Sequence, residues 1–141
     1  MLEIANHKIT TAKYVPMEIG KAIKPIAIVV HFTGGGSTES ALNTWKNTPI
    51  AAHVVVEKDG SITQCVPFDK RANHAGISSL HGKDGCNNFT IGIEIVNWGS
   101  LSKRADGSFF SWAGKEIPPD CVMLASHKIV NPDGTHNPNQ P

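Results

Sequence analysis

The 141-residue chain is the size of one domain, and its 40% hydrophobic content is ordinary for a globular protein with one core. Thirteen basic and twelve acidic side chains leave a formal net charge of +1, which removes the usual electrostatic argument for binding nucleic acid or an anionic membrane. The three cysteines are odd in number and form no Cys-x-x-Cys pair, so neither a disulfide scaffold nor a zinc ribbon is indicated.

The N-terminal segment lacks the basic and apolar regions of a signal peptide, and no stretch reaches the roughly 18 apolar residues of a membrane span. Cysteines without a disulfide pattern are typical of a reducing compartment. The sequence therefore predicts a cytoplasmic protein, or one released by cell lysis, with neither nucleic acid nor a membrane as its partner.

The first strong element is Ile26 to Phe32, IAIVVHF, a β-branched run typical of an interior strand covered on both faces. His31 lies at the exit of this strand, where α/β sheets usually place their ligands. Three glycines follow, and the segment STESALNTWKN then predicts a short helix capped by Ser37 or Thr38.

Two β-rich runs flank Lys58-Asp59-Gly60, which predicts a hairpin because Asp-Gly readily supplies the positive φ of such a turn. A third buried strand is predicted over Phe89 to Asn97. Residues 98–141 are polar and rich in Gly and Pro, and they predict a loop-rich insertion and tail with one brief helix at Asp120 to Ser126.

Glu94 is a carboxylate in the middle of a strand that otherwise predicts core. Burying it without a partner costs several kcal/mol at least, so a partner or a raised pKa is expected. A buried ion pair or an edge-strand position would explain it structurally, and a lone histidine such as His31 is often structural too. Together, the two residues also suit metal-assisted hydrolysis, in which a carboxylate takes the proton of zinc-bound water.

Three segments resemble the type 2 N-acetylmuramoyl-L-alanine amidases, a zinc family that includes amidases of cell-wall recycling, phage endolysins and the peptidoglycan-recognition proteins. The segments are VVHFTGG, AAHVVVEKDGSITQCVPFDKRANHAG and CNNFTIGIEIVN, which have the family's order and spacing. The resemblance implies an α/β fold, with a mixed central β-sheet flanked by helices, in a single domain over residues 1–141.

By this resemblance, His31 matches the first zinc ligand and Glu94 the catalytic glutamate. His74 and His53 match histidines near the cleft that are not zinc ligands. The Ala-Gly pair after His74 leaves room for a glycan or peptide, so we expect His74 to bind substrate. For His53, a substrate contact and a hydrogen-bonded structural role stay open. Ala52 occupies the position at which phage members carry a tyrosine, so the contribution of that tyrosine is absent and Glu94 must act as the catalytic residue without it.

The family takes its second and third zinc ligands from beyond a long C-terminal helix that this sequence does not match. We therefore expect the chain to lack that helix and the last ligand loop, and to leave apolar sheet surface exposed. His127 and His136 have about the spacing of the family's last two ligands, but they lie in turn-rich sequence, and we expect them outside the zinc site. His31 and Glu94 should face a common cleft, with His74 at its rim.

The function that the resemblance implies is zinc-dependent hydrolysis of the amide between N-acetylmuramic acid and L-alanine in peptidoglycan or muropeptides, by a protein that is monomeric when full length. Zinc on His31 would bind the lactyl carbonyl and activate water, and Glu94 would act as general base and then as general acid. The alternative is a non-catalytic peptidoglycan-binding module, or an inactive fragment, without a complete zinc site.

Overall fold

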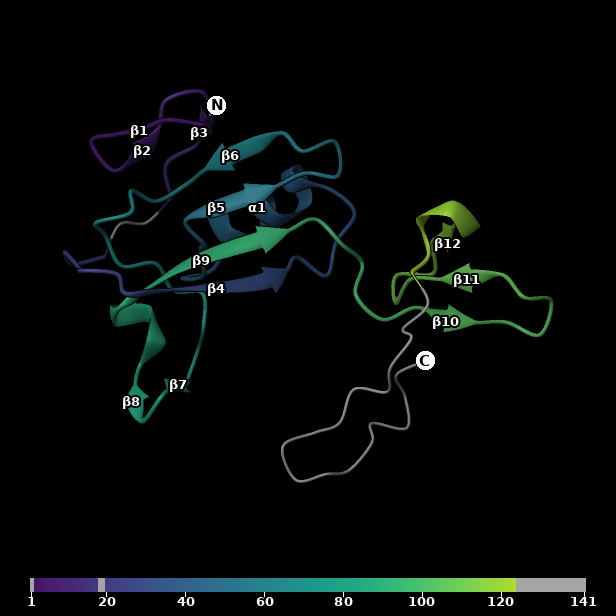
Figure 1. Cartoon of the computed structure of the whole chain (residues 1–141). Coiled ribbons are helices and arrows are strands. Elements are labelled where there is room, and N and C mark those ends of the chain that lie inside the picture. Colours follow the sequence, from purple (N-terminus) through teal and green to yellow (C-terminus); the bar gives the residue numbers. More distant parts are fainter. Residues whose placement is uncertain (1, 18–19, 124–141) are drawn as a thin grey trace. The chain divides into compact units, whose positions relative to one another are not determined.

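The structure is a computed structural model that describes residues 2–17 and 20–123, and it divides into two compact units at the Asn97–Trp98 boundary. The first unit is built on a five-stranded sheet with the strand order β3-β6-β5-β9-β4 (Figure 1). These strands are β3 (Lys13–Tyr14), β4 (Ala27–Phe32), β5 (Val54–Val56), β6 (Ile62–Gln64) and β9 (Thr90–Ile95). Strands β4 and β5 run parallel to β9, β3 runs parallel to β6, and β5 and β6 are antiparallel. The predicted mixed sheet of an α/β fold is confirmed.

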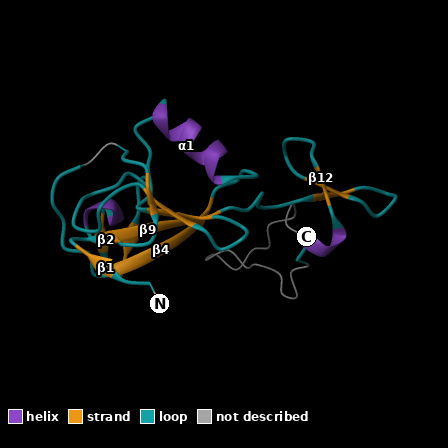
Figure 2. Cartoon of the chain, turned by 90° about the horizontal axis from the view of Figure 1, so that it is seen from above, coloured by secondary structure: helices purple, strands orange, loops and turns teal. Residues whose placement is uncertain are grey.

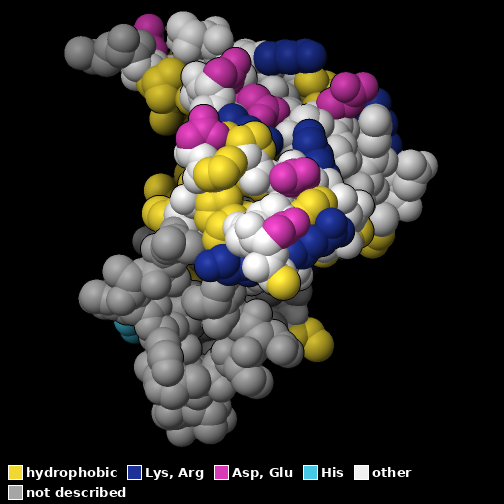
Figure 3. Space-filling view, turned by 90° about the vertical axis from the view of Figure 1, so that its right-hand side faces the viewer, with side chains coloured by type: hydrophobic (Ala, Val, Ile, Leu, Met, Phe, Trp, Pro, Cys, Tyr) yellow, Lys and Arg dark blue, Asp and Glu magenta, His cyan; other side chains and the backbone are white. Residues whose placement is uncertain are grey.

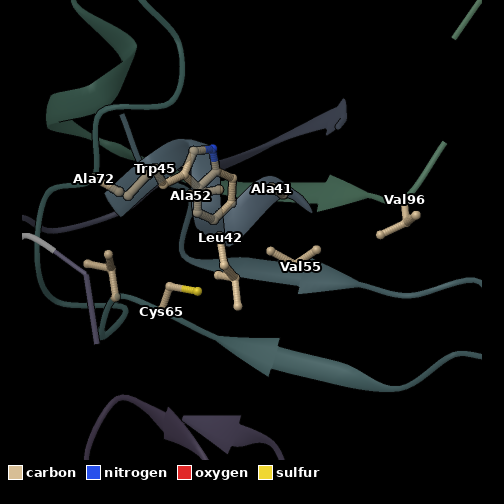
Figure 4. Close-up of a cluster of buried hydrophobic side chains, with 10 residues drawn as sticks. Ala41, Leu42, Trp45, Ala52, Val55, Cys65, Ala72 and Val96 are labelled. Carbon is tan, nitrogen blue, oxygen red and sulfur yellow. The ribbon is translucent and has the colours of Figure 1, made fainter. Parts of the chain in front are cut away.

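One α-helix, α1 (Thr38–Lys46), is present in the part of the chain that the structure describes. The Ser37 side chain accepts a hydrogen bond from the Ser40 N–H at 3.2 Å, so the first of the two predicted caps is correct. Helix α1 lies on one side of the sheet (Figure 2). Its buried side chains pack into the core cluster of Figure 4, which consists of Ala41, Leu42, Trp45, Ala51, Ala52, Val55, Cys65, Val66, Ala72 and Val96.

The register of the strands shows which face of the sheet each side chain occupies, because paired residues on neighbouring strands point to the same face. Glu94 on β9 pairs with His31 on β4 and with Val55 on β5. Val55 is fully buried in the core cluster beneath α1. His31 and Glu94 therefore lie on the α1 side of the sheet, beside the helix-covered core.

The opposite face of β4 is exposed. Ile28, Val30 and Phe32, which we call the apolar face of β4, are 62%, 61% and 60% exposed, and β4 is an edge strand. The prediction of an interior strand covered on both faces is wrong, because an apolar run shows that a segment is hydrophobic but not how many strands and layers adjoin it. The apolar sheet surface that we expected is present in the described residues.

Short elements complete the first unit. They are the hairpin of β1 (Ile4–Ala5) and β2 (Lys8–Ile9), the hairpin of β7 (Ser79–Leu80) and β8 (Lys83–Asp84), and the 3-10 helix η1 (Cys86–Asn88) that leads into β9. The first hairpin was not predicted from the sequence. Its signal was Asn6, which with His7 adopts positive φ values of 49° and 63°, as the tight turns of hairpins require.

The second unit contains an antiparallel three-stranded sheet of β10 (Ser102–Lys103), β11 (Phe109–Phe110) and β12 (Glu116–Ile117), followed by the 3-10 helix η2 (Pro119–Cys121). The sequence predicts loops over this region, so these strands were not expected. The η2 turn overlaps the start of the helix predicted at Asp120, and the end of that helix lies outside the described residues.

Surface charge is mixed, as the composition predicts. Figure 3 shows Lys and Arg side chains beside Asp and Glu side chains on the face that it presents, together with hydrophobic ones. Among the described residues, no helix is long and apolar enough to cross a membrane.

Candidate active site

The centre of the candidate site is the pairing of β4 with β9. Because the strands are parallel, their carboxyl ends meet, and His31 near the end of β4 lies directly beside Glu94 on β9. Strand β9 lies between β5 and β4, so Glu94 is not an edge-strand residue. Its Oε2 atom is buried and has no hydrogen-bond partner in the described part of the chain, and burial raises the pKa of this carboxyl group.

His74 lies against the sheet and contacts His31 directly. His31 Nε2 is 3.0 Å from His74 Nδ1, and His74 Nε2 is 3.1 Å from the Thr90 hydroxyl oxygen. The sequence suggested a position at the rim of a cleft, and that position stays a prediction. The contact with His31 depends on Gly92, because a Cβ atom there would lie only 2.3 Å from the imidazole ring of His74.

Asn87 holds the loop that carries His74. Its side-chain oxygen accepts hydrogen bonds from the backbone N–H groups of His74 and Ala75, at 3.0 and 2.8 Å, and Asn87 is itself buried. Asn87 and Thr90 were not predicted as site residues from the sequence. The available signal was their place in the segment CNNFTIGIEIVN, where two polar side chains precede a buried strand.

His53 is fully buried, and backbone groups use both of its ring nitrogens. The Gly92 N–H donates to Nδ1 at 3.0 Å, so Nδ1 is unprotonated, and Nε2 donates to the Lys70 carbonyl at 2.8 Å. The ring lies 5.8 Å from that of His74, measured between centroids. This is the hydrogen-bonded structural role that the sequence left open, and a direct substrate contact by His53 stays a prediction.

The imidazole rings of His31, His74 and His53 lie next to one another in that order, and the protonated form of each ring is disfavoured. Burial lowers the pKa of His31 and of His53. Burial, together with the neighbouring His53 and His31, lowers the pKa of His74 to about 4. All three rings are therefore uncharged at neutral pH, and they can act as hydrogen-bonding groups or, where a nitrogen lone pair is free, as metal ligands.

The donor set for a metal is incomplete within residues 2–17 and 20–123, where no three His, Cys, Asp or Glu side chains gather as a metal site would require. The imidazole of His31 is a suitable zinc ligand, and the orphaned Glu94 oxygen beside it is suited to accept a proton. Burial raises the pKa of the Cys65 thiol to about 12, which disfavours a metal-binding thiolate there. His127 and His136 lie outside the described residues.

Comparisons with known proteins show what the chain is similar to. The Amidase_2 family, described as N-acetylmuramoyl-L-alanine amidase, matches residues 21–135. The chain is 49% identical over 95 residues to the 1,6-anhydro-N-acetylmuramyl-L-alanine amidase AmpD of Salmonella typhimurium strain LT2. This match covers 63% of this chain and 50% of that protein. It is 51% identical over 53 residues to the AmpD of Citrobacter freundii, over 38% of this chain and 28% of that protein.

A crystal structure of a selenomethionine derivative of AmpD is also similar, with a TM-score of 0.56 and 30% sequence identity over 68% of this chain and 66% of that chain. The matched segments span half or less of the length of the two curated relatives. The family match extends over most of the chain, from β4 through Glu94 and into the second unit. The chain therefore belongs to the Amidase_2 family of N-acetylmuramoyl-L-alanine amidases.

Proposed function

We propose that the protein is a zinc-dependent amidase that hydrolyses the amide between N-acetylmuramic acid and L-alanine in muropeptides or peptidoglycan. The observation that carries the proposal is the side-by-side placement of the His31 imidazole and the Glu94 carboxylate, whose buried Oε2 has no partner among the described residues. Family membership and the amidases named above support the same activity.

In this proposal, His31 holds the zinc ion together with ligands that lie outside the described residues. When bound, zinc polarises the scissile carbonyl and lowers the pKa of its water to about 7. The protein's own part is to present an uncharged imidazole, and burial favours that form of His31.

Glu94 is the proposed general base and acid. An oxygen without a hydrogen-bond partner is free to accept the proton of the attacking water, and the raised pKa makes the carboxylate a better base at neutral pH. The protonated carboxyl group then donates to the departing nitrogen of L-alanine. In this proposal, Glu94 alone carries both proton-transfer steps.

Substrate binding is proposed at the loop of His74. The loop is exposed at Gly76, which has a positive φ of 54° and no side chain, so a peptide or glycan has room to approach the backbone there. Both ring nitrogens of His53 bond to the backbone, so in this proposal His53 holds Lys70 and Gly92 in place around the site, and a direct substrate contact by His53 stays a prediction.

The test is the variant Glu94→Gln, which keeps the size of the side chain and removes the base. We expect turnover to fall about 100-fold or more, as loss of a general base usually causes, while the circular dichroism spectrum is unchanged. The assay is release of the L-alanyl peptide, followed by chromatography and mass spectrometry, from an anhydro-muropeptide and from intact cell wall in parallel. Glu116→Gln, at an exposed position on β12, is the matched control and should be fully active. An unchanged rate for Glu94→Gln would remove Glu94 from the mechanism.

A non-catalytic peptidoglycan-binding module is the second candidate. It is favoured by the absence of three gathered metal ligands in the described ranges 2–17 and 20–123. The two functions differ in one measurement, since a binding module would retain the muropeptide in equilibrium dialysis without releasing peptide, with or without added Zn²⁺.

A further inference from the structure

Four groups on the α1 side of the sheet form one continuous chain of hydrogen bonds. The Thr90 hydroxyl oxygen is 2.7 Å from the Cys86 carbonyl oxygen and 3.1 Å from His74 Nε2. On the other side of the same ring, His74 Nδ1 is 3.0 Å from His31 Nε2. The chain therefore starts at a backbone carbonyl and ends on the proposed zinc ligand.

The direction of each hydrogen bond follows from the first one. A carbonyl oxygen only accepts, so the single hydrogen of the Thr90 hydroxyl is donated to Cys86. Toward His74, Thr90 can then only accept, and the hydrogen must be on His74 Nε2. An uncharged His74 has a lone pair on its other nitrogen, Nδ1, so His31 Nε2 must be the donor in the contact between the two rings.

We propose that His74 and Thr90 are positioning residues that fix His31 in the single tautomer with its proton on Nε2, which leaves the lone pair of Nδ1 for the metal. A second hydrogen bond that sets the tautomer and orientation of a metal-binding histidine is a general feature of metal sites. The tautomer is a property of the metal-free protein, and the inference rests on the proposed function only in naming zinc as the group that Nδ1 binds.

The surroundings of His74 are built to keep this acceptor in place. Gly92 leaves the space for its ring, since a Cβ would come within 2.3 to 2.7 Å of three ring atoms. Asn87 ties the backbone of the same residue down through two N–H groups, of His74 and Ala75. The ring of His74 thus lies against Gly92 of β9, and its backbone is held by Asn87 of η1.

The first experiment uses the whole 141-residue chain, free of metal and labelled with ¹⁵N in its histidine rings. Long-range ¹H–¹⁵N correlation spectra distinguish protonated from unprotonated ring nitrogens. At neutral pH we expect single tautomers with the proton on Nε2 for His31, His74 and His53. A His31 ring protonated on Nδ1, or exchanging between both tautomers, would overturn the proposal before any metal is added.

The second experiment removes the hydroxyl with Thr90→Val, and Thr63→Val on β6 is the matched control because Thr63 is also a buried strand threonine. We expect Thr90→Val to abolish the single tautomer of His31, and Thr63→Val to preserve it. Thr90→Ser keeps a hydroxyl at this position and should give the wild-type spectrum. This variant distinguishes the loss of the hydroxyl from a general loss of folding. An unchanged His31 spectrum in Thr90→Val refutes the positioning role.

The third experiment adds Zn²⁺ to the wild type and to Thr90→Val. In the wild type, the ion should shift the Nδ1 resonance of His31 and leave its Nε2 proton in place, and the apparent affinity of Thr90→Val should be about 10- to 100-fold lower. Zinc bound at Nε2 would overturn the inference. If zinc perturbs neither nitrogen while the metal-free tautomer is as expected, the proposed zinc function fails and the positioning of His31 remains.

Discussion

Replacement of Gly92 by alanine tests how closely His74 is seated on the sheet. A Cβ atom at Gly92 would lie 2.3, 2.6 and 2.7 Å from three atoms of the His74 ring, whereas ordinary contact begins at 3.4 Å. The ring must therefore move by about 1.1 Å, away from a position that Thr90 and the backbone bonds of Asn87 define.

The expected cost comes from two opposing effects. Overpacking of this kind destabilises by about 1 to 3 kcal/mol, and replacing a strand glycine by alanine otherwise stabilises by about 0.5 to 1 kcal/mol. We expect Gly92→Ala to lower the free energy of unfolding by about 1 to 2 kcal/mol, measured by urea denaturation with the fluorescence of the tryptophans. Gly35→Ala is the control, because a Cβ there meets its nearest atom at 3.5 Å and no positive φ is involved.

A double-mutant cycle identifies the cause. If the clash with the imidazole is responsible, Gly92→Ala should cost nothing in a His74→Ala background, which corresponds to a coupling energy of about 1 kcal/mol or more. An equal loss in both backgrounds would refute the reasoning, and the destabilisation would then have to come from the backbone of β9.

Three further predictions follow from other parts of the fold. His31→Ala should lower the zinc content of protein purified with added Zn²⁺, measured by elemental mass spectrometry, and full occupancy would exclude His31 as a ligand. Burial raises the pKa of Glu57, but hydrogen bonds from the N–H groups of Lys58 and Thr38 outweigh it, so the pKa is lowered overall. This carboxylate should therefore stabilise the fold at pH values above its unfolded pKa of about 4.5, and the stabilisation should be lost as the pH falls through the lower folded pKa. The free energy of unfolding should fall less steeply with decreasing pH in Glu57→Gln than in the wild type. Equal pH profiles of the two proteins would contradict this. The apolar face of β4 should make the chain self-associate, and Val30→Lys should shift its sedimentation toward the monomer; an unchanged sedimentation profile would contradict this.

The placement of His31 and Glu94 together could be predicted from strand alternation combined with the family resemblance. His31 and Glu94 each lie near the end of a strongly apolar strand, and parallel pairing brings them together. The cap at Ser37 and the hairpin at Asp59-Gly60 were also predictable, since both depend on local backbone hydrogen bonds.

Other features depend on contacts that a linear pattern does not contain. Thr90 and Asn87 act through His74, more than ten residues away, and their role appears only when the loop is folded back onto η1 and β9. The edge position of β4 depends on which strands pair, and not on its own composition. The strands of the second unit are two residues long, too short for any periodicity to be recognised.

The position of β4 at the edge of the sheet also ties the stability of one strand to the presence of a ligand. In the described sheet, β4 is bonded along one side only, to β9, so its local opening breaks the hydrogen bonds of that single pairing. His31 leaves the site whenever β4 opens, whereas the residues of the core cluster beneath α1 all lie outside β4. A ligand that contacts His31 and Glu94 together binds only the closed form, so each factor of ten in ligand excess over its dissociation constant adds about 1.4 kcal/mol to the free energy of opening β4. Amide hydrogen exchange along 27–32 thus reports occupancy of the site.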